Sequence, residues 1–309
     1  MRPNDSFVSS AGVETTALGG GRQASYEVIG DGRDALMLAG GPGFAAAYMR
    51  ADAQLFADVL RSYLVDPHGS GGSTPPADPA GYSPEGHGTF YEEVRRSLGL
   101  GPVVIFGHSF GATTALTYSA MYPDAVTACI AVGAFGIGEE QDEAQGGDAA
   151  AEMEAMLARH QDQPWFPDAK DVWDGWTERV LATDDPHEVE RMMATVLPLY
   201  TAHPDRPEVW AGLQGFEMHL QADLAAAKAW EGGVFQGIDL RPILGEIRAP
   251  TLVVAGELDI VCGPAQARPI HDGLANGELI LIPECGHMPV FESPGAYRAA
   301  VTGWLDRAL

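Results

Sequence analysis

The sequence predicts an α/β fold in which a mostly parallel sheet is flanked by helices and interrupted by a helical insertion. Short apolar runs rich in β-branched residues alternate with helix-like stretches, a pattern typical of strand–helix units that form a parallel sheet. These runs stop near Val132 and resume only at Thr251. The length of 309 residues fits one large domain, or a core that carries an insertion.

The apolar runs predict seven strands, at residues 26–29, 35–38, 63–65, 103–106, 128–132, 252–255 and 278–282. Helices are expected in the stretches between and after them, at about residues 48–60, 86–98, 111–121 and 294–307. Together these elements make up the predicted α/β core.

The middle of the chain has a different composition from the core. Residues 139–154 contain seven acidic and no basic side chains, and Met-, Trp- and Ala-rich helical stretches follow to about Trp230 without a clear strand. Five of the six tryptophans fall between Trp165 and Trp230, which suits a cap that lines an apolar pocket, although ordinary helix packing also uses aromatic residues. We therefore predict a core made of residues 1–134 and 241–309, and a helical cap made of residues 135–240.

Composition and charge exclude several kinds of partner. The chain has 18 Lys and Arg against 43 Asp and Glu, a formal charge of −25 that would repel nucleic-acid phosphates and anionic lipid headgroups. No stretch approaches the roughly 18 apolar residues of a membrane span, and the first 25 residues lack the apolar core of a signal peptide. Three widely spaced cysteines give no disulfide framework. We expect a cytoplasmic protein that binds neither nucleic acid nor membrane.

A candidate nucleophile lies directly after one predicted strand. The segment Gly107-His108-Ser109-Phe110-Gly111 follows the run at 103–106 and precedes a helix-like stretch. This strand, sharp turn and helix is the context that a G-x-S-x-G nucleophile elbow requires. Glycines beside the serine allow a tight, strained turn and a close approach of the backbone to substrate. Ser109 is the predicted nucleophile, and His108 is interpreted as a residue that only fills the elbow.

A serine hydroxyl needs a base, and the base needs an orienting carboxylate. Asp259 follows the predicted strand at 252–255, and His287 follows the strand at 278–282. Taken alone, Asp259 could be a helix cap and His287 an ordinary loop residue. Together with Ser109 they give the order Ser, Asp, His, each just past the carboxyl end of a strand, which is the order of α/β-hydrolases.

An oxyanion hole is predicted in the loop at residues 39–43, which reads Ala-Gly-Gly-Pro-Gly. Such a hole needs two backbone N–H groups, one from the residue after the nucleophile and one from the first core loop. Phe110 and Gly41 are the candidates. The alternative is that this loop is only a turn.

No cofactor or metal is expected. The sequence has no Walker A lysine and no H-E-x-x-H, and its nine histidines show no metal-ligand spacing. Residues 19–24 match a dinucleotide-binding pattern by letters, but no convincing strand precedes them and no helix follows. Cys262 is interpreted as a packed thiol, because no base is assigned to it.

These motifs in combination resemble the proline iminopeptidases and their relatives, which are serine hydrolases of the α/β-hydrolase fold. The resemblance rests on AGGPG, DPHGSGGS at residues 66–73, GHSFG, GELD and GHMPVFE, and it extends from about residue 26 to the end. In that family the oxyanion loop begins with histidine, and Ala39 stands at that position here.

The resemblance also implies how a substrate would be held. In the family, cap glutamates hold the free amino terminus of the substrate, one after a pair of tryptophans and one in a Glu-x-His segment. Glu178 follows Trp173 and Trp176, one position late, and Glu217 lies in the second segment. The alternative for each glutamate is a solvated helix face.

The resemblance implies a serine hydrolase that cleaves a small amide or peptide bond after a free amino-terminal residue, through an acyl-enzyme. One alternative is a carboxylesterase or lactonase with the same triad. An alternative of another class is a catalytically silent ligand-binding protein. The expected partner is a small-molecule or short-peptide substrate, and the oligomeric state is left open.

Overall fold

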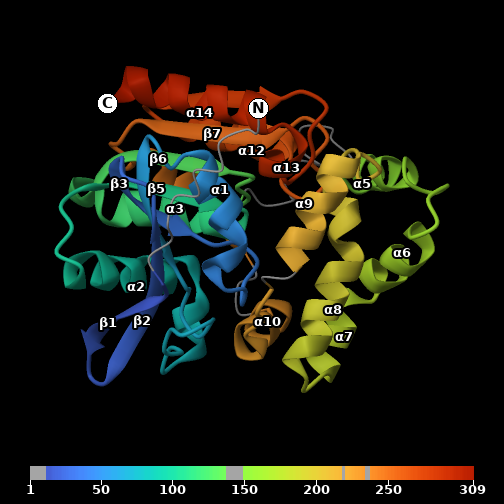
Figure 1. Cartoon of the computed structure of the whole chain (residues 1–309), viewed down its shortest axis with the longest axis horizontal. Helices are drawn as coiled ribbons and strands as arrows, with labels where there is room; N and C mark the ends of the chain where they lie inside the picture. The colour runs from blue at the N-terminus through green and yellow to red at the C-terminus, as the bar shows by residue number, and fades with distance from the viewer. Residues whose placement is uncertain (1–11, 137–148, 218–219, 234–236) are drawn as a thin grey trace, which may run out of the picture.

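The computed structural model describes residues 12–136, 149–217, 220–233 and 237–309. Its centre is an eight-stranded sheet in the order β1-β2-β4-β3-β5-β6-β7-β8 (Figure 1). The strands are β1 Glu14–Gly19, β2 Arg22–Ile29, β3 Arg33–Leu38, β4 Leu60–Val65, β5 Val103–His108, β6 Val126–Val132, β7 Thr251–Gly256 and β8 Gly277–Ile282.

Six of the strands, from β4 to β8 in the order of the sheet, run parallel. Their register places Leu38, Gly107, Ala131, Val253 and Leu279 in one line across the sheet. The loops that follow β3, β5, β6, β7 and β8 therefore leave from the same edge. This alignment gathers the residues that come after each strand.

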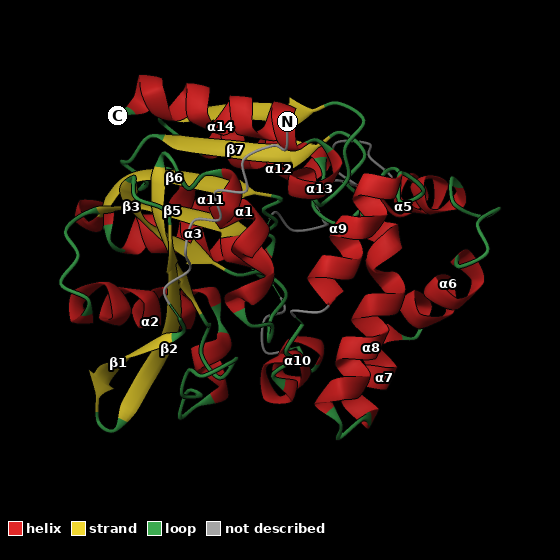
Figure 2. Cartoon of the chain, viewed as in Figure 1, coloured by secondary structure: helices red, strands yellow, loops and turns green. Residues whose placement is uncertain are grey.

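Helices cover both faces of the sheet (Figure 2). Alternate strand residues belong to two separate apolar cores, with α1 and α14 on one face and α2, α3 and α12 on the other. The helical elements outside the insertion are η1 Ala46–Met49, α1 Arg50–Leu55, η2 Pro79–Tyr82, α2 Pro84–Ser97, α3 Phe110–Met121, η3 Pro123–Ala125, α11 Arg241–Leu244, α12 Pro264–Gly273, α13 Pro289–Glu292 and α14 Pro294–Ala308. The predicted α/β fold with a mostly parallel, helix-flanked sheet is confirmed.

Strand β1 was not predicted from the sequence. It pairs antiparallel with β2 at the edge of the sheet, and none of its residues is fully buried, so it carries no apolar run. Gly19, at the end of β1, and the two glycines that follow it all have positive φ and make the hairpin turn. The glycine-rich match at residues 19–24 is therefore a turn between two strands.

The single helix predicted at residues 48–60 is wrong in its second half. The helix α1 ends at Leu55, and the chain enters strand β4 at Leu60. Residues 56–59 form a turn instead, in which the Ala57 and Val59 carbonyls accept the N–H groups of Asp31 and Arg33 (both 3.0 Å), so hydrogen bonds to a distant segment override the local helical preference.

Between β6 and β7 the described residues form helices and no strand of the sheet. These elements are α5 Ala149–Ala158, α6 Phe166–Asp174, α7 Trp176–Ala182, α8 Pro186–Val196, η4 Leu197–Tyr200, α9 Pro207–Glu217 and α10 Leu224–Glu231. In Figure 1, α5 to α9 gather at the end of the molecule away from the β1–β2 hairpin. Most of the acidic run at 139–154 lies outside the described residues, and the predicted boundaries of the cap stay a prediction.

The segment before α10 reaches back to the core. The Asp223 N–H donates to the Gly43 carbonyl (2.5 Å), and Phe44 and Ala222 form an isolated bridge.

No helix in the described part of the chain is long and apolar enough to cross a membrane.

Candidate active site

Ser109 occupies a strained turn between β5 and α3. Its φ of 57° and ψ of −126° are unusual for a residue with a side chain, and its N–H donates to the Val132 carbonyl (2.8 Å). A Cβ at Gly107 would lie 2.1 Å from the Gly111 carbonyl oxygen, and one at Gly111 would lie 2.0 Å from the Leu38 carbonyl oxygen. The turn that presents Ser109 therefore requires both flanking glycines.

Asp259 and His287 meet at the ends of β7 and β8. The Nδ1 of His287 lies 2.8 Å from Oδ2 of Asp259, and both side chains are almost completely buried. The other carboxylate oxygen of Asp259 accepts the N–H groups of Val261 (2.8 Å) and Cys262 (2.9 Å). Burial alone would raise the pKa of Asp259, but the His287 ring and these hydrogen bonds hold it below its ordinary value. The carboxylate is charged and fixes which nitrogen of His287 carries the proton.

The second ring nitrogen of His287, Nε2, is buried and has no hydrogen-bond partner among the described residues. Catalytic hydrogen bonds are often loose before substrate binds and tighten in the Michaelis complex. Burial and the charge of Asp259 hold the pKa of Cys262 well above its ordinary value, so this residue is a protonated, packed thiol.

The loop that carries His287 is held by contacts that the sequence analysis missed. The carboxylate of Glu292 accepts the N–H groups of Gly286 (2.9 Å) and Met288 (3.1 Å), the two neighbours of His287. It also accepts the N–H of Ala202 (2.7 Å), in the segment between η4 and α9. The Glu292 carboxylate thus fixes the backbone on both sides of the histidine. In the sequence analysis Glu292 stood only as the last letter of the motif GHMPVFE, and no role was assigned to it.

Gly133 directly follows β6 and is a second residue of the site that the sequence analysis missed. It has a φ of +61°, and a Cβ there would lie 2.9 Å from Cε1 of His287. Only a residue without a side chain leaves room for the imidazole in this position.

The predicted oxyanion loop lies against the elbow. A Cβ at Gly40 would lie 2.7 Å from the Ser109 Cβ, and the Gly40 N–H donates to the Tyr48 hydroxyl (2.5 Å). Because that N–H is already used, Gly41 stays the predicted donor of this loop. Gly41 and Phe110 both line the cavity at Ser109, as an oxyanion hole needs. Ala39 is buried in the core.

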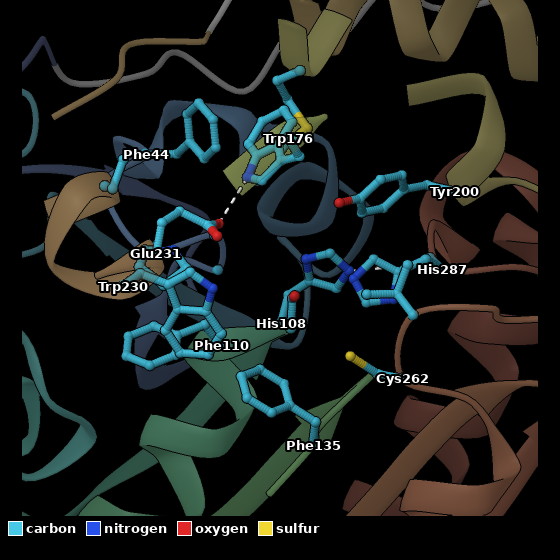
Figure 3. Close-up of a pocket in the computed structure, with 18 of the residues that line it drawn as sticks. Phe44, His108, Phe110, Phe135, Trp176, Tyr200, Trp230, Glu231, Cys262 and His287 are labelled. Atoms are coloured by element: carbon cyan, nitrogen blue, oxygen red, sulfur yellow. Dashed lines mark hydrogen bonds between the residues drawn. The ribbon is translucent and has the colours of Figure 1, made fainter. Parts of the chain in front are cut away.

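A cavity of about 1050 Å³ opens over Ser109 and His287 (Figure 3). Aromatic rings from core and inserted helices line much of it; they belong to Phe44, Tyr48, Phe110, Phe135, Trp176, Tyr200, Phe216 and Trp230. A pocket walled by apolar rings with a few polar groups is typical of a small-molecule site.

Glu231, the last residue of α10, is a carboxylate that lines this cavity. Its oxygens accept hydrogen bonds from Trp176 Nε1 (2.8 Å) and Thr177 Oγ1 (2.6 Å), and Figure 3 shows the contact with Trp176. Both donors are uncharged. The sequence analysis did not single out Glu231, although it directly follows the last tryptophan of the Trp-rich segment.

The two glutamates implied by the resemblance have different positions. Glu178 is exposed on α7 and does not line the cavity, whereas Trp176 on the same helix does. The structure therefore does not bring Glu178 to the site. Glu217 is the last residue of α9, and its side chain lies outside the described part of the structure.

The described residues contain no group of three or more His, Cys, Asp or Glu side chains that could hold a metal ion.

The fold and this site define a hydrolase of the α/β fold. A family model described as alpha/beta hydrolase fold matches residues 36–294, and the chain belongs to this family. Its curated relatives include a proline iminopeptidase of Clostridium botulinum, 23% identical over 294 residues that cover 91% of this chain and 92% of that protein. A probable proline iminopeptidase of Leptolyngbya boryana is 28% identical over 293 residues, 85% of this chain and 84% of that protein. The resemblance to proline iminopeptidases is confirmed.

Solved structures share the fold. An alpha/beta fold family hydrolase from Bacillus anthracis has a TM-score of 0.73 at 16% identity, covering 96% of this chain and 100% of that one. An enol-lactonase from Burkholderia xenovorans has a TM-score of 0.69 at 18% identity, covering 94% of this chain and 99% of that one.

Proposed function

We propose that the protein is a serine hydrolase that works through an acyl-enzyme. The observation that carries this proposal is the buried Asp259–His287 pair beside a strained serine at the floor of one large cavity. Ser109 is the nucleophile, His287 the general base, and Asp259 the group that orients and stabilises His287.

The tautomer of His287 supports this assignment. Because Nδ1 donates its proton to Asp259, Nε2 has a free lone pair and can take the proton of the Ser109 hydroxyl. The serine oxygen then attacks the substrate carbonyl carbon, and the N–H groups of Gly41 and Phe110 stabilise the oxyanion. His287 returns the proton to the leaving group, and water attacks the acyl-enzyme by the same route.

We propose a small amide or peptide with a free amino-terminal residue as the substrate. The curated relatives named as proline iminopeptidases support this class. Glu231 supports it from the structure, because a carboxylate among aromatic rings suits an ammonium group. Glu217 stays a candidate for the same role through the resemblance, and Glu178 is the weakest of the three because of its exposure.

A carboxylesterase or lactonase is the second candidate. The same triad would serve it, the cavity wall is rich in aromatic rings, and an enol-lactonase shares the fold. A third candidate, a ligand-binding protein without activity, predicts that Ser109 reacts with nothing.

A fluorophosphonate probe tests the nucleophile. We expect covalent labelling of the wild-type protein at Ser109, no labelling of Ser109→Ala, and a loss of kcat on the order of 10⁶-fold in that variant. A folded Ser109→Ala protein that keeps more than a few per cent of the activity would exclude this nucleophile, and an unlabelled wild type would favour the ligand-binding protein.

Paired substrates test the acyl group. Glu231→Gln should lower kcat/KM for aminoacyl anilides roughly 10- to 150-fold, because it removes a charge-assisted hydrogen bond worth about 1.5 to 3 kcal/mol. N-acetylated anilides and simple esters never make that contact, so their rates should change little. Glu178→Gln, an equal loss of charge on an exposed face, is the matched control and should have no effect.

Glu217→Gln measured on the same substrates decides between the two remaining glutamates. If neither Glu231→Gln nor Glu217→Gln discriminates free amines from acetylated ones, the amine-binding role is wrong. Faster turnover of simple esters than of aminoacyl anilides by the wild type would favour the esterase.

A further inference from the structure

A chain of three hydrogen bonds runs beside the catalytic groups through Tyr48 and His108, which also line the cavity. The Gly40 N–H lies 2.5 Å from the Tyr48 hydroxyl, and that hydroxyl lies 3.2 Å from His108 Nδ1. His108 Nε2 lies 3.0 Å from the backbone carbonyl of His287. The side chains of Tyr48 and His108 are both buried.

The chemistry of the two ends fixes the direction of every bond in this chain. The Gly40 N–H can only donate, so the Tyr48 oxygen accepts from it. The His287 carbonyl can only accept, so His108 Nε2 carries a proton and donates it. Burial lowers the pKa of His108 to about 3, so its ring is neutral and Nδ1 accepts the remaining proton from the Tyr48 hydroxyl. Each donor and acceptor in the chain is matched.

This chain of hydrogen bonds connects the last residue of one strand with the loops that follow two other strands. Gly40 belongs to the loop after β3, His108 ends β5 one residue before Ser109, and His287 lies in the loop after β8. At Gly40 the loop already touches the elbow, because a Cβ there would meet both the His108 carbonyl oxygen (2.4 Å) and the Ser109 Cβ (2.7 Å). The His108 ring also packs against the His287 ring, and the two ring centroids are 4.8 Å apart.

We propose that Tyr48 and His108 are positioning residues, which set the oxyanion loop and the His287 loop in register with Ser109 through this chain. The proposal rests on the proposed serine-hydrolase function. It replaces the interpretation of His108 as a residue that only fills the elbow. The two residues act through the loops and not on the reacting atoms, so they should affect kcat more than KM.

The test compares Tyr48→Phe, His108→Phe and the double variant. Each single change should lower kcat about 10- to 100-fold, since small displacements of catalytic groups have effects of this size. The double variant should be no slower than the slower single variant, because breaking the chain once already uncouples the loops. KM should stay within about threefold of the wild type.

Two further variants separate positioning from general stability. Tyr118→Phe removes another buried tyrosine hydroxyl, which donates to Glu92. Glu92 would still form its ion pairs with Arg95 and Arg96. This control variant should leave kcat unchanged. His108→Gln retains one donor and one acceptor and should keep more activity than His108→Phe. If His108→Phe does not fold, the kcat values of Tyr48→Phe and His108→Gln are compared with that of the wild type instead.

Fluorophosphonate labelling of the wild type keeps the two proposals distinguishable. If the wild type is not labelled, the proposed function fails. If the wild type is labelled and active, but folded Tyr48→Phe and His108 variants keep kcat within about twofold, the positioning role is overturned. Losses that multiply in the double variant would also overturn it, because they would mean that the two side chains act independently.

Discussion

A general base works in one tautomer, and the neighbours of His287 select it. Asp259 accepts a hydrogen bond from the Nδ1–H group, while contacts to the backbone on both sides of the histidine hold the ring in place. The site thus depends on residues that never touch the substrate as well as on those that do.

Asp259→Asn tests the selection of the tautomer. An amide at this position can offer an N–H to Nδ1 and favour the wrong tautomer, so kcat should fall roughly 10⁴-fold while substrate binds almost normally. Steady-state kinetics and substrate binding to the Ser109→Ala, Asp259→Asn protein measure both effects. Near-normal turnover would mean that another carboxylate is the triad acid.

Gly133→Ala tests the space around the imidazole. The new methyl group would lie 2.9 Å from His287 Cε1, and we expect kcat to fall about 100-fold as the ring is displaced. Gly99→Ala is the matched control, because Gly99 has a similar φ of +66° and no atom within 4 Å of its added Cβ. Both variants should lose about 1–2 kcal/mol of stability from backbone strain, but only Gly133→Ala should lose activity. Equal activities would show that the imidazole tolerates the methyl group.

Sequence reasoning pointed to Ser109, Asp259 and His287 because each lies a short distance after the end of a strand. Position after a strand was not enough to single out Gly133, and Tyr48 lies in a helical turn, since the importance of both comes from contacts with residues distant in the chain. Glu231 was missed for the same reason: its place in the cavity depends on how α10 packs against α7 and η2.

At the scale of elements, α13 acts as a clamp on the loop before it. Its last residue, Glu292, reaches back to three backbone N–H groups in two separate segments. A four-residue helix has little stability of its own, so this carboxylate supplies much of the local order.

Glu292→Gln should therefore reduce both stability and turnover. An amide nitrogen cannot accept, so at least one N–H loses its charged acceptor, and the free energy of unfolding should fall by roughly 1.5 to 3 kcal/mol. Denaturant unfolding and kcat are the two measurements. Glu284→Gln, an exposed change in the same loop, should alter neither by much. Normal turnover in Glu292→Gln would mean that His287 is held without the clamp.

Element prediction succeeded for buried strands and failed at β1 and in the second half of the helix predicted at 48–60. Buried parallel strands have continuous apolar runs that the sequence displays. The edge strand β1 has no such run, and the turn at residues 56–59 is held by hydrogen bonds to Asp31 and Arg33, which are distant in the chain.

At the scale of the whole molecule, negative charge dominates. With 43 acidic and 18 basic side chains, repulsion among carboxylates opposes the folded state. Local ion pairs such as Arg95–Glu92 offset only part of this repulsion.

Added NaCl should raise Tm by several degrees at pH 7. Going from about 0.01 M to about 1 M ionic strength shortens the Debye length from about 30 Å to about 3 Å and screens the repulsion. Thermal unfolding followed by circular dichroism measures the change. The effect should vanish near pH 4.5, where the net charge approaches zero. A salt-independent Tm at pH 7 would mean that the charges are already balanced locally.

Two of the contacts between the inserted segment and the His287 loop use main-chain atoms of that segment. The His287 N–H donates to the Tyr200 carbonyl, and the Ala202 N–H donates to Glu292. Side-chain identity at positions 200 and 202 is therefore free to change without loss of these two bonds, provided that the backbone follows the same path. A chimera that takes its inserted segment from a relative should keep a working base if the graft preserves that path and keeps Tyr200, whose ring packs against His287 with the ring centroids 5.5 Å apart.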